Sequence, residues 1–216
     1  MKNKGKGLIF LGLLLIAAAL FLTAYNLYDE MRAGQSARQV ISRLENHLTA
    51  EGTEEASAEP ALQQDADHDG RTTVPDYILC PDMEMPAETV DGVDYIGVLA
   101  IPALDLELPV ISQWSYPGLR TAPCRYSGSA YSDDLILAGH NYSTHFGGLK
   151  YLSEGDVVTF TDADGNEFSY AVVEREILGP TDVEEMEDGE WDLTLFTCTV
   201  GGQSRVTVRC EREQMN

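Results

Sequence analysis

The sequence predicts a mainly β domain that follows one N-terminal transmembrane helix. From Tyr95 onward, short apolar or alternating runs are separated by turn residues and show little helical periodicity, which is typical of strands. Before that point the chain carries one long apolar stretch and one segment with helical spacing. Because the first part of the 216 residues is used by the membrane segment, one domain of about 120–150 residues is expected.

The apolar stretch runs from Gly7 to about Leu27, long enough to cross about 30 Å of hydrocarbon as a helix. Lys2, Lys4 and Lys6 precede it, which places the amino terminus inside and the rest of the chain outside the cell membrane. A cleaved signal peptide is the alternative, since Leu22-Thr23-Ala24 has the small-residue character of a cleavage site. The length of the run favours an uncleaved single-pass anchor, residues 1–29.

The next segment, residues 30–92, is expected to form a stalk helix and a linker. Apolar residues recur at helical spacing and predict an amphipathic helix over 30–49, which either packs on the catalytic domain or extends the stalk; they are Ala37, Val40, Ile41, Leu44 and Leu48. From Ala50 to about Arg71 almost no large apolar residue occurs, so this part is expected to be a flexible linker. The catalytic domain is then residues 93–216.

One stretch of that linker resembles half of a calcium loop. Asp65-Ala-Asp67-His-Asp69-Gly70 has the spacing, and Asp76 stands where the bidentate acid belongs. However, the last acid is Asp instead of Glu, Pro75 precedes it, and no helix with an apolar stripe follows. A solvated acidic linker is therefore the preferred interpretation, and no metal is expected.

The charge balance excludes nucleic acid as a partner. Without the three lysines before the span, 11 Lys and Arg remain against 36 Asp and Glu, which gives the exported part a net charge of −25. Such a surface repels a polyphosphate chain. Solubility at the cell surface is the simplest reason for the acidity.

Within the β domain the clearest hairpin joins Asp156–Thr161 to Asn166–Val173 through residues 162–165. Asp164-Gly165 supplies the positive φ that a tight turn requires.

Three reactive side chains lie at the ends of predicted strands. His140 ends Leu135-Ile-Leu-Ala-Gly-His140, Cys198 ends Thr194-Leu-Phe-Thr-Cys198, and Arg205 opens Arg205-Val-Thr-Val-Arg209. A thiolate attacks a peptide carbonyl usefully only if one group protonates the leaving amine and another stabilises the oxyanion. His140 suits the first task, and a guanidinium, with its fixed fork of donors, suits the second. The pattern indicates a cysteine nucleophile site.

These three segments, in this order and spacing, resemble the His box, the Thr-Leu-x-Thr-Cys box and the final Arg strand of sortases, the cysteine transpeptidases of Gram-positive cell surfaces. Tyr95–Pro102, which resembles their first barrel strand, Leu108-Pro109-Val110 and Arg125–Ser129 extend the resemblance over roughly residues 93–213.

The resemblance implies an eight-stranded sortase-type β-barrel with short helices. It implies that Cys198 attacks the Thr–Gly bond of an LPxTG-like sorting signal on a surface protein, that His140 protonates the departing amine and that Arg205 stabilises the oxyanion. An amine of a lipid-linked peptidoglycan precursor or of a pilin then resolves the thioester. No cofactor is implied. The boxes are similar to class B enzymes, but the segment Ile177–Asp192 is too short for the class B insertion.

Other residues are candidates for the site. His145 competes with His140, although His145 lies in the loop after the strand. Arg209 lies four residues after Arg205 on one strand, so both can point to the same face; a surface ion pair is its alternative. The expected substrate contacts are Arg209, Asn141, Trp191, Met186 and Thr197, and for the last three a structural or packing role is the alternative.

Cys80, Cys124 and Cys210 remain besides the nucleophile. Cys124 and Cys210 flank the expected site strands and could pair, or all three could be free thiols. Two other functions stay open at this point: a hydrolytic cysteine protease, which needs no amine acceptor, and a surface β-domain without catalysis.

Overall fold

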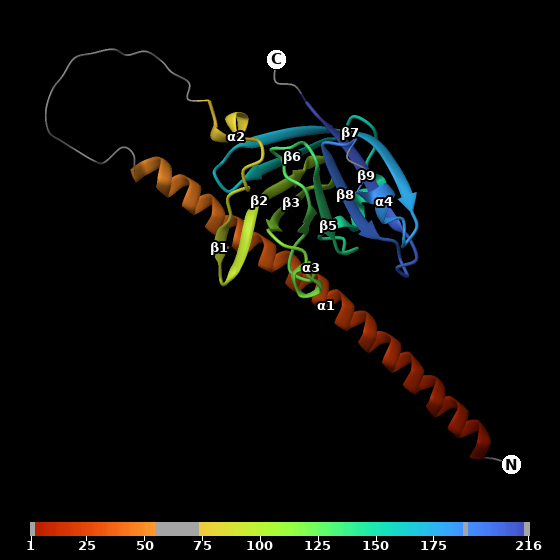
Figure 1. The fold of residues 1–216 in the computed structure, drawn as a ribbon. Coiled ribbons are helices and arrows are strands. Elements are labelled where there is room, and N and C mark those ends of the chain that lie inside the picture. The colour runs from red at the N-terminus through yellow and green to blue at the C-terminus, as the bar shows by residue number, and fades with distance from the viewer. Residues whose placement is uncertain (1–2, 55–73, 188–189, 214–216) are drawn as a thin grey trace, which may run out of the picture.

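The computed structural model describes residues 3–54, 74–187 and 190–213. Its elements are α1 (Asn3–Glu54), α2 (Asp76–Leu79), β1 (Glu88–Val90), β2 (Val93–Ile101), η1 (Pro102–Leu104), β3 (Leu106–Ile111), α3 (Tyr116–Leu119), β4 (Cys124–Ser127), β5 (Leu135–Gly139), η2 (Phe146–Tyr151), β6 (Val157–Asp162), β7 (Glu167–Leu178), α4 (Val183–Met186), β8 (Leu193–Cys198) and β9 (Arg205–Arg212). Figure 1 shows the strands gathered into one body, with α1 running past it.

The strands form a closed barrel, as predicted. Their order is β1-β2-β3-β4-β5-β8-β9-β7-β6, and a further pairing of β2 with β6 joins the two ends. Eight strands therefore close the barrel, while β1 is a hairpin partner added to β2. Most pairs are antiparallel, but β3–β4 and β5–β8 are parallel. The carboxyl ends of β5 and β8 therefore lie at the same rim.

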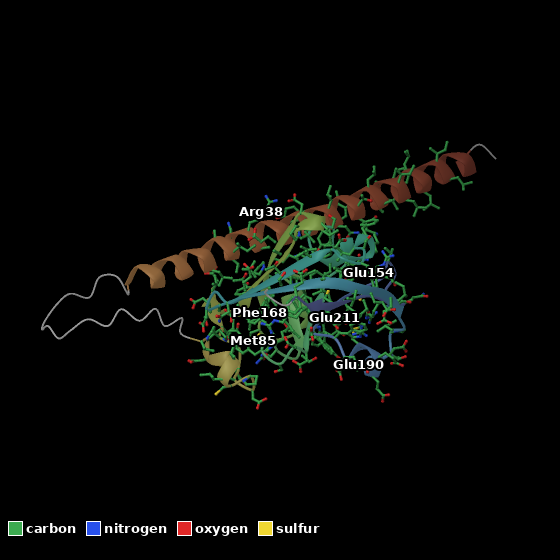
Figure 2. The ribbon with its side chains drawn as sticks, turned by 90° about the horizontal axis from the view of Figure 1, so that it is seen from above. Arg38, Met85, Glu154, Phe168, Glu190 and Glu211 are labelled. Carbon is green, nitrogen blue, oxygen red and sulfur yellow. The ribbon has the colours of Figure 1, made fainter. Side chains whose placement is uncertain are left out.

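The core fills the inside of this barrel. Alternate residues of each strand point inward, and the innermost are fully buried: Leu99, Leu135, Leu137, Phe160, Tyr170, Leu193, Leu195 and Val208. Met85, from the segment before β1, and Phe168 belong to the same cluster and lie within the body of the molecule in Figure 2. The predicted hairpin is confirmed as β6 and β7, with Gly165 at φ 84° in its turn.

Helix α1 contains both the expected membrane helix and the expected helix over residues 30–49. It is one continuous helix from Asn3 to Glu54, and Figure 2 shows it lying along one side of the barrel. Its segment Leu8–Tyr28 has 21 residues, a mean hydropathy of 2.6 and no burial, so it is long and apolar enough to cross a membrane.

The second half of α1 packs on the barrel, which decides between the two roles expected for it. Ala37, Val40, Ile41 and Leu44 are all buried. Val40 and Leu44 share a cluster with Val90, Tyr95 and Ile111 of β1 to β3, and with Ala122 and Cys124. The helix continues through residues 50–54, where a linker was expected, and residues 55–73, which include the calcium-like Asp65–Gly70, lie outside the described part of the chain.

Candidate active site

His140 and Cys198 lie at the same rim of the barrel. In the parallel pair of β5 and β8 the register is Gly139 opposite Thr197. His140 follows the end of β5 directly and Cys198 is the last residue of β8. The imidazole and the thiol therefore come immediately after the last pair of a shared ladder. Local sequence explains the register, since both strands are apolar runs that must bury Leu135, Leu137, Leu193 and Leu195 inside.

Arg205 lies directly across from the thiol on the neighbouring strand. Cys198 and Arg205 are Cα partners in the antiparallel pair of β8 and β9, and residues opposite each other point to the same face. The connection between the strands is short, with Gly201 at φ 91° and Gly202 at φ 73°. The Arg205 guanidinium donates to the carbonyls of Gly202 and Ser204 at 3.2 and 3.1 Å, which keeps it at the rim.

The two histidines of the rim have different environments. His140 is half-buried and stacks on Tyr142, with ring centroids 4.8 Å apart and planes at 29°. Tyr142 in turn contacts His145 at 5.5 Å, and His145 is 0% exposed. A fully buried imidazole cannot reach a peptide substrate, so the geometry favours His140 over His145. Asn141, next to His140, is half-buried.

Gly139 sets the position of the loop that carries His140. A Cβ at this residue would lie 2.5 Å from the ring of Phe146, and Phe146 is fully buried. The amide of Phe146 also donates to the carbonyl of His140 at 3.1 Å. Glycine is therefore required for the loop to fold back against the end of β5.

Thr197 is placed inside the barrel wall and does not share the face of Cys198. It is 3% exposed, and its hydroxyl donates to the carbonyl of Gly139 at 2.8 Å. This geometry supports the alternative in which Thr197 is a structural strand residue. The bond links β8 to β5 one residue before the thiol and the imidazole.

Arg209 shares the face of Arg205 but is covered. It is 2% exposed, whereas Arg205 is half-buried at the rim. The segment that follows β7 covers it, and Met186 of this segment is 5% exposed. Trp191, close to the start of β8, is half-buried. The structure thus brings His140, Cys198 and Arg205 together and leaves Arg209 and Met186 beneath the surface.

One pair beside the thiol was not predicted as part of the site. Phe196 points to the same face as Cys198 because it is two residues away on β8, and its ring meets Tyr126 of β4 edge-on at 5.4 Å. Burial first, and then the negative charge of Glu187 and its interaction with the hydroxyl, raise the pKa of Tyr126. Phe196 is the variable position of the Thr-Leu-x-Thr-Cys box, so the motif carried no signal for it.

All four cysteines are free thiols, so the pairing of Cys124 with Cys210 is wrong. Cys124 belongs to the cluster under α1 and Cys210 to the barrel core. Burial raises the pKa of Cys124 to about 11 and that of Cys210 to about 12, which keeps both unreactive near neutral pH. Cys80 is exposed on the surface.

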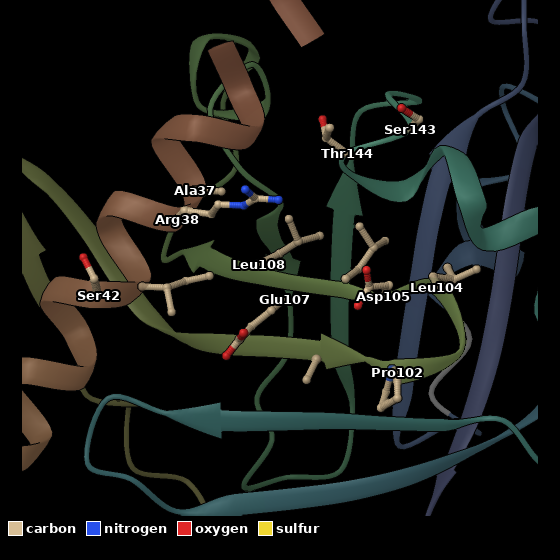
Figure 3. Close-up of a pocket in the computed structure, with 13 residues that line it drawn as sticks. Ala37, Arg38, Ser42, Pro102, Leu104, Asp105, Glu107, Leu108, Ser143 and Thr144 are labelled. Carbon is tan, nitrogen blue, oxygen red and sulfur yellow. The ribbon is translucent and has the colours of Figure 1, made fainter. Parts of the chain in front are cut away.

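A cleft of about 780 Å³ lies apart from the thiol, between α1 and the β2–β3 hairpin (Figure 3). Arg38, Leu104, Asp105 and Glu107 line it, together with Ser143 and Thr144 of the loop after His140. In the described ranges 3–54, 74–187 and 190–213, no group of three or more His, Cys, Asp or Glu side chains is placed to hold a metal ion.

Comparison with known proteins identifies the family and the fold. The sortase domain family model matches residues 99–213. The chain is 32% identical to sortase A of Bacillus anthracis over 125 residues, which is 55% of this chain and 59% of that protein. It is 29% identical to sortase D of Bacillus subtilis (strain 168) over 107 residues, 47% of this chain and 53% of that protein. The chain thus spans somewhat over half the length of these relatives.

Solved structures share the fold. Sortase C1 from Streptococcus agalactiae superposes with a TM-score of 0.53 at 24% identity, covering 68% of this chain and 80% of that one. Clostridium perfringens sortase C, solved with the C-terminal cell wall sorting motif, gives a TM-score of 0.50 at 22% identity over 56% of this chain and 72% of that one. With a family model that covers residues 99–213 and the eight-stranded barrel, this chain belongs to the sortase family of cysteine transpeptidases.

Proposed function

We propose that this chain is a membrane-anchored sortase that cleaves an LPxTG-like sorting signal at its Thr–Gly bond and transfers the protein to an amine. The observation that supports it most is the alignment of three strand ends. The ladders Gly139–Thr197 and Cys198–Arg205 put the imidazole, thiol and guanidinium positions side by side on β5, β8 and β9.

The proposed reaction has two halves, formation of a thioester on Cys198 and its attack by an amine. The Cys198 thiolate adds to the threonine carbonyl, and Arg205 donates to the oxyanion that forms. The tetrahedral intermediate collapses as the bond to the glycine nitrogen breaks, and His140 gives that nitrogen its proton. An amine then attacks the thioester, loses a proton to His140 and releases the thiolate. The product is a new amide, with no net change in redox state.

The site face suits an acyl chain next to the thiol. Phe196 and Tyr126 form an aromatic surface two residues from Cys198, which can pack against the apolar residues of a sorting signal. Asn141, half-buried beside His140, and Trp191, half-buried before the start of β8, are further proposed contacts. Clostridium perfringens sortase C, which shares this fold, has been solved with a C-terminal cell wall sorting motif, and this supports the same class of substrate here.

The proposed arrangement in the cell keeps the barrel close to the membrane. Residues 1–29 serve as the cytoplasmic tail and anchor, 30–92 as the stalk, and 93–216 as the catalytic domain. From Tyr28, where the candidate span ends, to Ala37, a residue of α1 that is buried against the barrel, the helix rises only about 14 Å. This distance suits an acceptor held in the same membrane, such as a lipid-linked peptidoglycan precursor; a pilin amine is the other acceptor.

The test is turnover of an LPxTG peptide by the full chain in detergent, with and without an added amine. The wild type is expected to form an amide with the amine, and Cys198→Ala to form no product. Cys80→Ala, which removes the exposed thiol, is the matched control and should behave as the wild type. Residual turnover by Cys198→Ala within about tenfold of wild type would exclude Cys198 as the nucleophile.

The same assay separates the two other functions. A hydrolytic cysteine protease releases the same acid product whether or not the amine is present. A β-domain without catalysis leaves the peptide intact, and Cys198 then forms no thioester that hydroxylamine can trap.

A further inference from the structure

Arg209 is the largest of the fully buried side chains in the described part of the molecule, at 2% exposure. Its Nε donates to Glu176 of β7 at 2.8 Å, and this ion pair crosses from β9 to β7. Its Nη1 donates to the Thr194 hydroxyl of β8 at 3.0 Å. A buried guanidinium with such partners is costly to place, so its position calls for an explanation beyond core packing.

The remaining donors of Arg209 hold the segment 183–187. Nη1 also donates to the carbonyl of Met186 at 3.1 Å, and Nη2 donates to the carbonyl of Glu185. These are carbonyls at the end of α4, a helix of one turn that cannot satisfy them itself. One planar fork therefore connects three strands of the barrel to a segment that follows β7.

Other contacts hold the same segment against the outer face of the barrel. Thr207 of β9 donates to the Met186 sulfur at 3.9 Å. Burial, and then the charge of nearby Glu187, raise the pKa of Tyr126 on β4, so the end of the segment lies near that hydroxyl. Because Thr194, Phe196 and Cys198 alternate onto one face of β8, a segment above Thr194 that also reaches Tyr126 borders the aromatic surface beside the thiol.

We propose that Arg209 is a positioning residue that fixes segment 183–187 as one wall of the sorting-signal site. The inference rests on the proposed function of that site and deepens it. Arg209 does not touch the reacting atoms; it acts through Met186 and Glu187. Lysine cannot replace it, since a single ammonium cannot point at a carboxylate, a hydroxyl and two carbonyls in separate directions.

The perturbation is Arg209→Lys in the full chain in detergent, with Arg212→Lys as the matched control. Arg212 lies on the same strand and forms an ion pair with Asp133 at 2.7 Å. Its guanidinium donates to Asp133 and to the carbonyl of Ala130, both far along the chain from segment 183–187. Arg209→Met, which fills similar space without charge, is a second variant in case the first unfolds.

Two readouts are expected to change. A glutamate-specific protease, which cuts after the glutamates of 183–187, should cleave Arg209→Lys at least about tenfold faster than Arg212→Lys, because the anchored segment opens locally. With the LPxTG peptide, kcat/KM should fall by about 10- to 100-fold, mainly through KM, as a displaced wall misplaces the substrate. The rate at which iodoacetamide modifies Cys198 should stay within about twofold, since the thiol itself is not moved.

The outcomes separate the inference from the proposed function. Equal cleavage of the two lysine variants by the protease overturns the anchoring. Faster cleavage with unchanged KM overturns the role as a substrate wall. A loss carried by kcat and by Cys198 modification, with KM unchanged, assigns Arg209 to the catalytic groups instead. If the wild type turns over no sorting peptide, the proposed function is wrong, and so is the role of segment 183–187 as a wall of its site. Proteolysis still shows in that case whether Arg209 holds the segment.

Discussion

Replacing Thr197 with valine tests whether one hydroxyl holds the two reactive strand ends in register. Its Oγ1 donates to the carbonyl of Gly139 at 2.8 Å. The bond joins Thr197, the residue before Cys198 on β8, to Gly139, the last residue of β5 and the one before His140. Valine keeps the branched shape and replaces the hydroxyl by a methyl group, which cannot donate.

The expected loss follows from burial and bond length. Thr197 is 3% exposed, so water cannot easily replace the lost donor, and a buried carbonyl short of a partner costs about 1–2 kcal/mol. Thr207→Val is the matched control on the adjacent strand. Thr207 is 0% exposed, but its hydroxyl meets a thioether at 3.9 Å, a weak acceptor, so the same change should cost less than about 0.5 kcal/mol.

Urea denaturation measures the free energy of unfolding of both variants, and the slope checks that the unfolding transition is unchanged. In the peptide assay, Thr197→Val should lower kcat more than it raises KM, because the two reacting groups drift apart while the substrate wall stays. An equal or greater destabilisation in Thr207→Val would refute the reasoning, and so would full activity in a destabilised Thr197→Val.

Three further outcomes are expected. Arg205→Lys should lose about 2.7–4 kcal/mol of transition-state stabilisation in kcat/KM, because a point charge replaces a fork of donors; an unchanged kcat/KM would remove Arg205 from the oxyanion role. Deleting residues 1–29 should give a soluble enzyme active on short peptides. Deleting 1–54 should in addition expose the apolar surface under α1 and lower the unfolding temperature. Equal unfolding temperatures of the two deletion variants would show that the second half of α1 is not part of the fold. Iodoacetamide near pH 8 should label Cys80 and Cys198 in the native chain and all four thiols after unfolding, as mass spectrometry would count; native labelling of a buried thiol would contradict the packing.

The barrel was predictable because its pattern is local. Strands with one buried face alternate, and the hairpin of β6 and β7 is marked by Asp164-Gly165. The eight-stranded closure came from the resemblance to sortases, since the pairing of β2 with β6 joins segments far apart in sequence. No periodicity within either strand specifies that partner.

The continuous helix α1 was not predicted because hydropathy and backbone conformation change at different places. The apolar run ends near Tyr28, and the amphipathic spacing begins at Ala37. The residues between them include no proline, so no missing amide interrupts the hydrogen-bond ladder. The docking of the second half depends on an apolar surface formed by β1, β2 and β3, which exists only after the barrel folds.

The roles of Arg205 and Arg209 show where a strand pattern stops being informative. A period of two puts both on one face of β9, and both were reasonable oxyanion donors. Their difference comes from what covers them: Arg205 faces Cys198 across the ladder at the rim, while Arg209 faces Thr194 beneath the carbonyls of Glu185 and Met186. The segment that covers Arg209 follows β7, and its path depends on tertiary packing that the strand pattern does not encode. The same guanidinium chemistry therefore suits an oxyanion at one position and fixed backbone carbonyls at the other. Only the guanidinium at the rim, that of Arg205, can meet a substrate.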